Sequence, residues 1–204
     1  MPTVHPEGPR TDRAGIADFD ALLAGVKLGR PSAWDGCYRC LAPVVAGYLR
    51  MQGAREVDDL TSEVFLAMFR NIATFSGTEA NFRSWVFVIA HRRLQDERRR
   101  RFRRPVYDVS DEMHTGSGND PVGPDPAADT AEEAIRAIAT ERVTELCARL
   151  VADQRDVVLL RILGDLTVEQ VAEVLDKSPG AVKQLQRRAF CALRRLVDRE
   201  GVPL

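Results

Sequence analysis

Near the middle of the chain lies a segment that cannot build a hydrophobic core. Residues 106–133 contain eight acidic residues, no lysine or arginine, three prolines and three glycines. Such a segment buries too little apolar surface to offset the conformational entropy lost on folding. The sequence therefore predicts two small domains, over residues 16–104 and 134–204. An acidic, flexible linker over residues 105–133 joins them, and a disordered leader over residues 1–15 precedes them.

Both predicted domains have the apolar periodicity of helices. Apolar side chains recur every three or four residues, and no alternating run rich in β-branched residues occurs anywhere in the sequence. Most of the predicted helix starts carry a side chain that can cap a helix. These starts are Ala17, Ser32, Asp58, Asn81, Thr130, Asp153, Thr167 and Ser178. The sequence thus predicts an all-α protein.

The composition excludes several classes of protein. Of the 204 residues, 45% are hydrophobic and 29% are charged, which is typical of a globular chain. The longest nearly apolar stretch, residues 41–49, is far shorter than the roughly 20 residues of a membrane span. Residues 1–10 lack the apolar region of a secretory signal, and the four cysteines are too scattered for a disulfide framework. We therefore expect a cytoplasmic protein with no membrane partner.

The net charge of −1 conceals two strongly basic segments. Residues 81–105 carry nine arginines against Asp96 and Glu97, for a net charge of +7. Residues 179–199 carry six lysines and arginines against one aspartate, for a net charge of +5. Cations at this density are expected of a surface that binds nucleic-acid phosphates, although a basic helix can also be a merely solvated face.

The end of the chain has the features of a helix-turn-helix. Thr167 and Gln170 form a capping-box pattern at the start of one helix, and Ser178 followed by proline opens the next. Only Asp176 and Lys177 separate the two helices, and aspartate tolerates the left-handed backbone that so tight a turn requires. Caps, turn, apolar spacing and local charge agree, so the sequence predicts a DNA-binding helix-turn-helix.

Six sequence strings, three in each domain, follow the order found in a known protein family. They are VDDLTSEVFL at 57–66, FRSW at 82–85, IAHRRLQD at 89–96, QRDVVLLR at 154–161, LTVEQVAEVL at 166–175 and SPGAVK at 178–183. Together they resemble the extracytoplasmic-function (ECF) group of bacterial sigma-70 factors, which have only sigma domains 2 and 4. The first three strings look like region 2 and the last three like region 4.

The resemblance implies a promoter-specificity subunit of bacterial RNA polymerase. Such a subunit binds the polymerase core, through the clamp of the largest subunit and the flap, and recognises the −35 and −10 promoter elements. It is not an enzyme and needs no cofactor or metal, and many relatives have an anti-sigma factor as a further partner. Three positions depart from the usual family pattern, namely Arg92, Lys177 and Leu185, and they concern the promoter sequence rather than the class.

Each implied activity has candidate residues in this chain. Base and phosphate contacts to the −35 element are expected from Thr167, Ser178, Lys183, Gln184, Arg187, Arg188 and Arg194. Capture of an unstacked −10 base and its phosphates is expected from Phe75, Ser76, Asn81, Phe82, Arg83, His91, Arg92, Arg93, Arg98 and Arg99. Docking on the polymerase core is expected from Asp58, Asp59, Leu60, Glu63, Phe65, Leu66 and Phe69.

Two other functions fit part of the sequence. The chain could be a helix-turn-helix repressor or activator that never contacts polymerase. It could also be a nucleic-acid enzyme in which Asp58, Asp59 and Glu63 hold a metal, although acids at a helix start also complement the helix dipole. Cys37 and Cys40 form a single CxxC without a nearby histidine, which favours packing thiols over a metal or redox site.

Overall fold

The structure is a computed structural model, and it describes residues 18–103 and 141–200. The described secondary structure is helical and contains no strand, which confirms the predicted all-α class. Its elements are α1 (Phe19–Lys27), α2 (Pro31–Met51), α3 (Val57–Asn71), the 3-10 helix η1 (Ile72–Thr74), α4 (Glu79–Arg103), α6 (Ala152–Ile162), α7 (Val168–Leu175) and α8 (Pro179–Glu200). Residues 141–148 are also helical. The predicted leader and linker lie outside the described residues.

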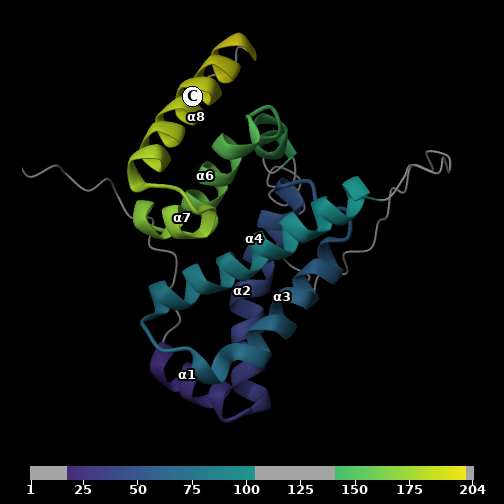
Figure 1. Ribbon diagram of the computed structural model, residues 1–204, viewed down its shortest axis with the longest axis vertical. Coiled ribbons are helices and arrows are strands. Elements are labelled where there is room, and N and C mark those ends of the chain that lie inside the picture. Colours follow the sequence, from purple (N-terminus) through teal and green to yellow (C-terminus); the bar gives the residue numbers. More distant parts are fainter. Residues whose placement is uncertain (1–17, 104–140, 201–204) are drawn as a thin grey trace, which may run out of the picture.

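The first domain is a bundle of α1 to α4 (Figure 1). Helices α2, α3 and α4 pack against one another, and α1 packs against the start of α2. Their facing sides bury large side chains completely, including Tyr48, Leu49, Met68 and Phe87. Each such side chain contributes about 1.5–3 kcal/mol by its removal from water. This shared apolar contact fixes α4, the helix that carries the arginine-rich segment.

Several predicted helix starts were wrong by one to three residues. Helix α2 begins at Pro31 instead of after Ser32, because proline with its fixed φ suits the first turn. Helix α3 begins at Val57, so Asp58 lies in its first turn and does not cap it. Helix α6 begins at Ala152, which places Asp153 likewise inside the first turn. These aspartates therefore complement the helix dipole instead of capping backbone amides.

The start of α4 uses a different cap from the predicted one. Thr78 precedes the helix, and its Oγ1 accepts a hydrogen bond from the Asn81 backbone N–H at 3.3 Å. In return, Asn81 Oδ1 accepts from the Thr78 backbone N–H at 3.2 Å. Thr78 is thus the capping residue. Asn81 is the third residue of the helix, and its side chain completes the reciprocal pair of hydrogen bonds.

The helix-turn-helix is built as the sequence predicts. Thr167 and Gln170 form a complete capping box at the start of α7. Asp176 ends this helix with left-handed backbone, φ 52° and ψ 49°. Ser178 Oγ then accepts a hydrogen bond from the Ala181 backbone N–H at 3.2 Å and so caps α8. These three local features set the angle at which α8 leaves the turn.

The two domains are in contact. Helix α7 lies along α4, and the start of α6 approaches the end of α2 (Figure 1). One cluster of buried apolar side chains extends across both domains, from Val86 and Phe87 of α4 to Leu166 and Val171 of the second domain. Over the residues that the structure describes, no helix has both the length and the apolar character that crossing a bilayer requires.

Candidate nucleic-acid interface

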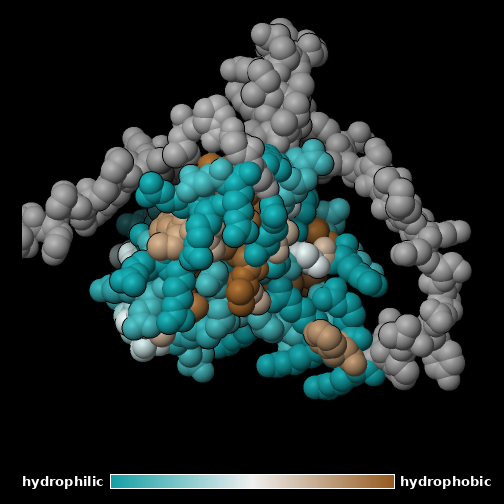
Figure 2. Space-filling view, turned by 90° about the horizontal axis from the view of Figure 1, so that it is seen from above, coloured by the Kyte–Doolittle hydropathy of each residue, from teal (hydrophilic) through white to brown (hydrophobic). Residues whose placement is uncertain are grey.

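Helix α8 has an apolar, buried side and a cationic, exposed side. Val182 and Ala189 are completely buried, and Val182 belongs to the core cluster that also contains α7 residues. The predicted −35 side chains of this helix are all exposed: Lys183, Gln184, Arg187, Arg188 and Arg194. Seen from the end of the molecule where α8 lies, hydrophilic side chains cover most of the surface (Figure 2). With 22 residues, α8 is about 33 Å long, enough to lie in a major groove.

The two hydroxyl residues predicted at the −35 interface, Thr167 and Ser178, both cap the start of a helix. Thr167 Oγ1 accepts from the Gln170 backbone N–H at 3.2 Å, and Ser178 Oγ accepts from that of Ala181. Both residues are exposed. A hydroxyl that accepts a backbone hydrogen bond still has its own proton to donate, so each can also contact a phosphate.

The aromatic side chains near the start of α4 form a packed cluster. The Phe82 ring is 2% exposed and its centroid lies 5.2 Å from that of Phe75, 5.6 Å from that of Phe19 and 5.9 Å from that of Trp85. Phe75 is half-buried and stacks on Trp85, while Ser76 is exposed. We therefore assign Phe82 to the core, because a ring enclosed by three aromatic neighbours has no free face for a base.

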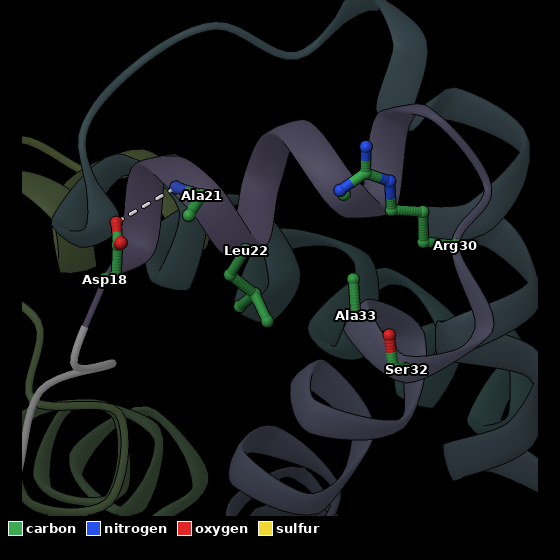
Figure 3. A pocket seen from close by; sticks show the side chains of 7 residues that line it. Asp18, Ala21, Leu22, Arg30, Ser32 and Ala33 are labelled. Atoms are coloured by element: carbon green, nitrogen blue, oxygen red, sulfur yellow. Dashed lines mark hydrogen bonds between the residues drawn. The ribbon is translucent and has the colours of Figure 1, made fainter.

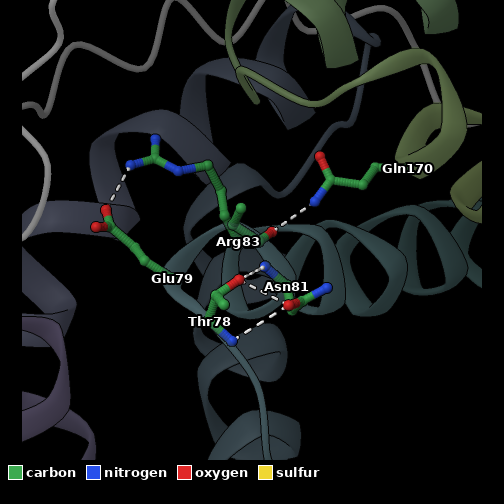
Figure 4. A network of polar contacts seen from close by, with 6 residues as sticks. Thr78, Glu79, Asn81, Arg83 and Gln170 are labelled. Carbon is green, nitrogen blue, oxygen red and sulfur yellow. Dashed lines mark hydrogen bonds and ion pairs between the residues drawn. The ribbon is translucent and has the colours of Figure 1, made fainter.

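At the same end of α4, polar side chains are joined by hydrogen bonds and an ion pair (Figure 4). The Arg83 guanidinium lies 3.2 Å from Glu79 Oε1, and Asn81 is part of the cap described above. Gln170 of α7 reaches across and donates its Nε2 proton to the Ala80 carbonyl at 2.9 Å. The second domain therefore contacts the backbone where the predicted −10 interface begins.

Two predicted −10 residues lie in a buried polar cluster between the domains. The Tyr48 hydroxyl lies 2.8 Å from His91 Nδ1. Arg98 donates to the Gln52 carbonyl at 2.8 Å and to Gln52 Oε1 at 3.1 Å. Gln52 in turn donates to the Asp156 carboxylate, which is 5% exposed. Burial lowers the pKa of His91. Burial also raises the pKa of Asp156, although the nearby His91 and Arg98 act in the opposite direction.

The other predicted −10 arginines face outward. Arg92 and Arg99 are exposed, and Arg93 is half-buried. Arg93 Nε lies 3.8 Å from Glu63 Oε2, and Arg99 forms a surface ion pair with Asp96 at 3.5 Å. Surface pairs of this kind contribute little stability, so phosphates can replace the carboxylates at small cost.

The residues predicted to dock on polymerase divide into buried and exposed groups. Leu60 and Phe65 are buried and belong to the core, whereas Asp58 and Asp59 are exposed. Leu66 and Phe69 are 55% and 56% exposed despite their size. Exposed apolar side chains of this size, close together on one helix, mark an interaction surface.

This surface also contains two aromatic residues of α2 that sequence reasoning missed. Trp34 packs against Phe69 with ring centroids 4.9 Å apart, and Tyr38 packs against Phe65 at 4.7 Å. Tyr38 is 47% exposed. The four-residue spacing of Trp34 and Tyr38 places both rings on one face of a helix, and this was the sequence signal for the surface. We call Trp34, Tyr38, Leu66 and Phe69 the aromatic patch.

Three further features lie apart from these surfaces. A shallow hollow between α1 and α2 is lined by Asp18, Arg30 and small or aliphatic side chains (Figure 3). Asp18 accepts from the Ala21 backbone N–H at 3.1 Å and so caps α1. All four cysteines are free, and burial raises the pKa of the Cys37 thiol to about 12. In the described part of the chain, no three histidine, cysteine, aspartate or glutamate side chains gather as a metal site would require.

Comparison with known families matches both domains. The sigma-70 region 2 family matches residues 37–104, and the sigma-70 region 4 family matches residues 148–195. The ECF sigma factor ShbA of Streptomyces griseus is 33% identical over 144 residues, covering 70% of this chain and 72% of ShbA. The ECF sigma factor SigK of Mycobacterium tuberculosis H37Rv is 30% identical over 186 residues, covering 89% of this chain and 95% of SigK.

A solved structure shares the fold. CnrH in complex with the cytosolic domain of CnrY superimposes with a TM-score of 0.59 at 23% identity, covering 88% of this chain and 96% of that one. With both regions matched and the relatives covered over most of their length, this chain belongs to the ECF sigma factors of the sigma-70 family. It is a promoter-recognising subunit of RNA polymerase, which overturns the alternative of a repressor or activator that never contacts polymerase.

The assignment of Phe82 to the core is tested by its removal. Phe82→Ala should lower the free energy of unfolding by about 3–5 kcal/mol, because it leaves a cavity among three aromatic rings. Urea denaturation followed by circular dichroism measures this. Phe102→Ala is the matched control on the same helix, since that ring is 85% exposed and should change stability by less than about 0.5 kcal/mol. An unchanged stability of the Phe82 variant would contradict the assignment of this ring to the core.

Proposed function

We propose that this sigma factor reads the −35 element with α8, holds the −10 element with the outward side of α4, and docks on the polymerase core through the aromatic patch and the acids of α3. The observation that carries the proposal is the outward cationic side of α8, held by a fully capped helix-turn-helix. The protein acts in the cytoplasm as a non-catalytic transcription initiation factor.

At the −35 element, the first three turns of α8 enter the major groove. Lys183, Gln184 and Arg187 are exposed there and present donors that match base edges, such as the O6 and N7 acceptors of guanine. Arg188 and Arg194 contact phosphates and so position the helix. The backbone amides and hydroxyl at the start of α7, beside Thr167, offer a further phosphate contact.

At the −10 element, Arg92, Arg93 and Arg99 bind phosphates along the outward side of α4. Phe75 and Ser76, in the loop before this helix, are the side chains available to an unstacked base, since Phe82 is enclosed. Asn81 and Arg83 support the loop through the cap and the ion pair with Glu79. His91 and Arg98 lie at the inner edge of this interface, where His91 contacts Tyr48 and Arg98 contacts Gln52.

At the polymerase core, the aromatic patch meets the clamp of the largest subunit, and the second domain meets the flap. Large apolar side chains surrounded by acids are typical of a protein–protein contact with a polar rim. An anti-sigma factor is the further partner we propose, since CnrH, which has the same fold, was solved with the cytosolic domain of CnrY.

The −35 assignment predicts two kinds of defect. Lys183→Ala and Arg187→Ala should each weaken holoenzyme binding to a cognate promoter by about 1–3 kcal/mol and relax base preference, because they remove base contacts. Arg188→Ala, the matched control one residue further, should weaken binding to all sequences alike and flatten its salt dependence. Electrophoretic mobility shifts on a set of −35 variants at two salt concentrations separate these cases. Equal losses on every sequence for Lys183→Ala would contradict its role.

The docking assignment predicts a defect in core association. Phe69→Ala should weaken binding to purified polymerase core by about 1–3 kcal/mol, because it truncates the exposed aromatic side chain of the patch. Leu28→Ala is the control, since this side chain is 70% exposed but lies at the end of α1. Fluorescence anisotropy of labelled chain titrated with core gives both affinities. A Phe69 variant that binds like wild type would remove the patch from the interface.

A further inference from the structure

Helix α8 exposes one large aromatic side chain. Phe190 is 46% exposed, although phenylalanine is among the residues most often buried in a core. The buried side of the helix is already occupied by other residues, since Ala189 belongs with Val158 of α6 to one buried cluster. Phe190 therefore lies beside that buried side, with nearly half of its surface in water.

The exposed ring belongs to the cationic side of the helix. Phe190 follows Lys183 by seven residues and Arg187 by three, and it precedes Arg194 by four. Residues at these spacings share one face of a helix, and all three cations are exposed. Helical side chains lean toward the start of their helix, which directs the ring toward Arg187. Phe190 is thus in one row with side chains assigned above to the −35 interface.

The charges around Phe190 favour DNA as its partner. A protein partner would have to offer an apolar pocket within an acidic surface to satisfy both the ring and the flanking cations. The major groove offers phosphates for the cations. It also presents the C5 methyl group of thymine, an apolar group on a base edge that a phenylalanine ring can contact. A thymine in the groove therefore matches the apolar ring and its basic neighbours together.

The position of Phe190 along α8 indicates which base pair it meets. A helix rises 1.5 Å per residue, so Phe190 lies about 4.5 Å beyond Arg187 along the axis. Successive base pairs are about 3.4 Å apart. With α8 lying in the groove, the ring faces the base pair next to the one that Arg187 contacts.

We propose that Phe190 is a specificity-determining residue of the −35 interface: its ring contacts the C5 methyl group of a thymine beside the base pair that Arg187 contacts. This inference rests on the proposed function of α8 and deepens it. Lys183, Gln184 and Arg187 read hydrogen-bonding groups, whereas Phe190 reads an apolar one. It favours thymine over cytosine at this position, because cytosine lacks the methyl group.

Replacement of thymine by deoxyuridine tests the contact, since it removes the methyl group alone. In a promoter found by start-site mapping, each thymine of the −35 region is replaced in turn, and holoenzyme binding is measured by electrophoretic mobility shift. With the wild-type chain, one replacement should weaken binding about 4-fold, as expected for one buried methyl group. With Phe190→Ala, the same replacement should leave binding unchanged.

Two control variants should keep the 4-fold ratio between the two DNAs. Val151→Ala removes another exposed apolar side chain of the same domain, directly before α6 and 68% exposed. Arg188→Ala should weaken binding to both DNAs alike, because it removes a phosphate contact. Each ratio is taken on one protein, so a change in the stability of a variant cancels from it.

Two results would overturn the proposal. The first is a −35 region in which no thymine replacement weakens binding of the wild-type chain. The second is a Phe190→Ala variant that keeps the wild-type ratio, which would assign the ring to a protein contact instead. Both leave the proposed function intact as long as Lys183→Ala and Arg187→Ala relax base preference. Loss of that effect would contradict the proposed function itself.

Discussion

The structure depends on the burial of one side of α4. That helix packs against α2 and α3 within its own domain and against α7 of the second domain, so its apolar residues hold the whole described molecule together. Phe87 lies at the junction, with Tyr48 edge-on to it on one side and Gly164 close to it on the other. The arginines that follow on the same helix are thereby held at defined positions on the surface.

This packing determines where the charged residues lie on the surface. The net charge of −1 conceals a basic α4, a basic α8 and an acidic segment over residues 106–133 between them in sequence. Because the two basic helices belong to different domains, their separation decides which DNA they can bind together. The outward side of α8 is exposed, whereas the start of α4 is contacted by Gln170 of the second domain at the Ala80 carbonyl.

Local features of the fold were predictable from the sequence. The capping box of Thr167, the left-handed Asp176 and the Ser178 cap depend on neighbours in sequence, and all three predictions are confirmed. The helix starts at Ser32, Asp58, Asn81 and Asp153 were misplaced, because a residue able to cap is equally suited to the first turn.

Contacts between distant residues were not predictable. Gln52 and Asp156 are 104 positions apart, and Gln170 and Ala80 are 90 apart, so no sequence period relates them. The enclosure of Phe82 also depends on tertiary packing, since its ring meets α1, the loop before α4 and Trp85. The exposed side of α8 was predictable because its apolar and basic residues alternate with the helical period.

The most direct test of the account is transcription by purified polymerase core on fragmented genomic DNA, with and without this chain, followed by mapping of RNA 5′ ends. The account predicts new start sites that appear only with the chain. These sites should share two upstream sequence elements about 25 base pairs apart. Start sites that are the same with and without the chain would contradict it.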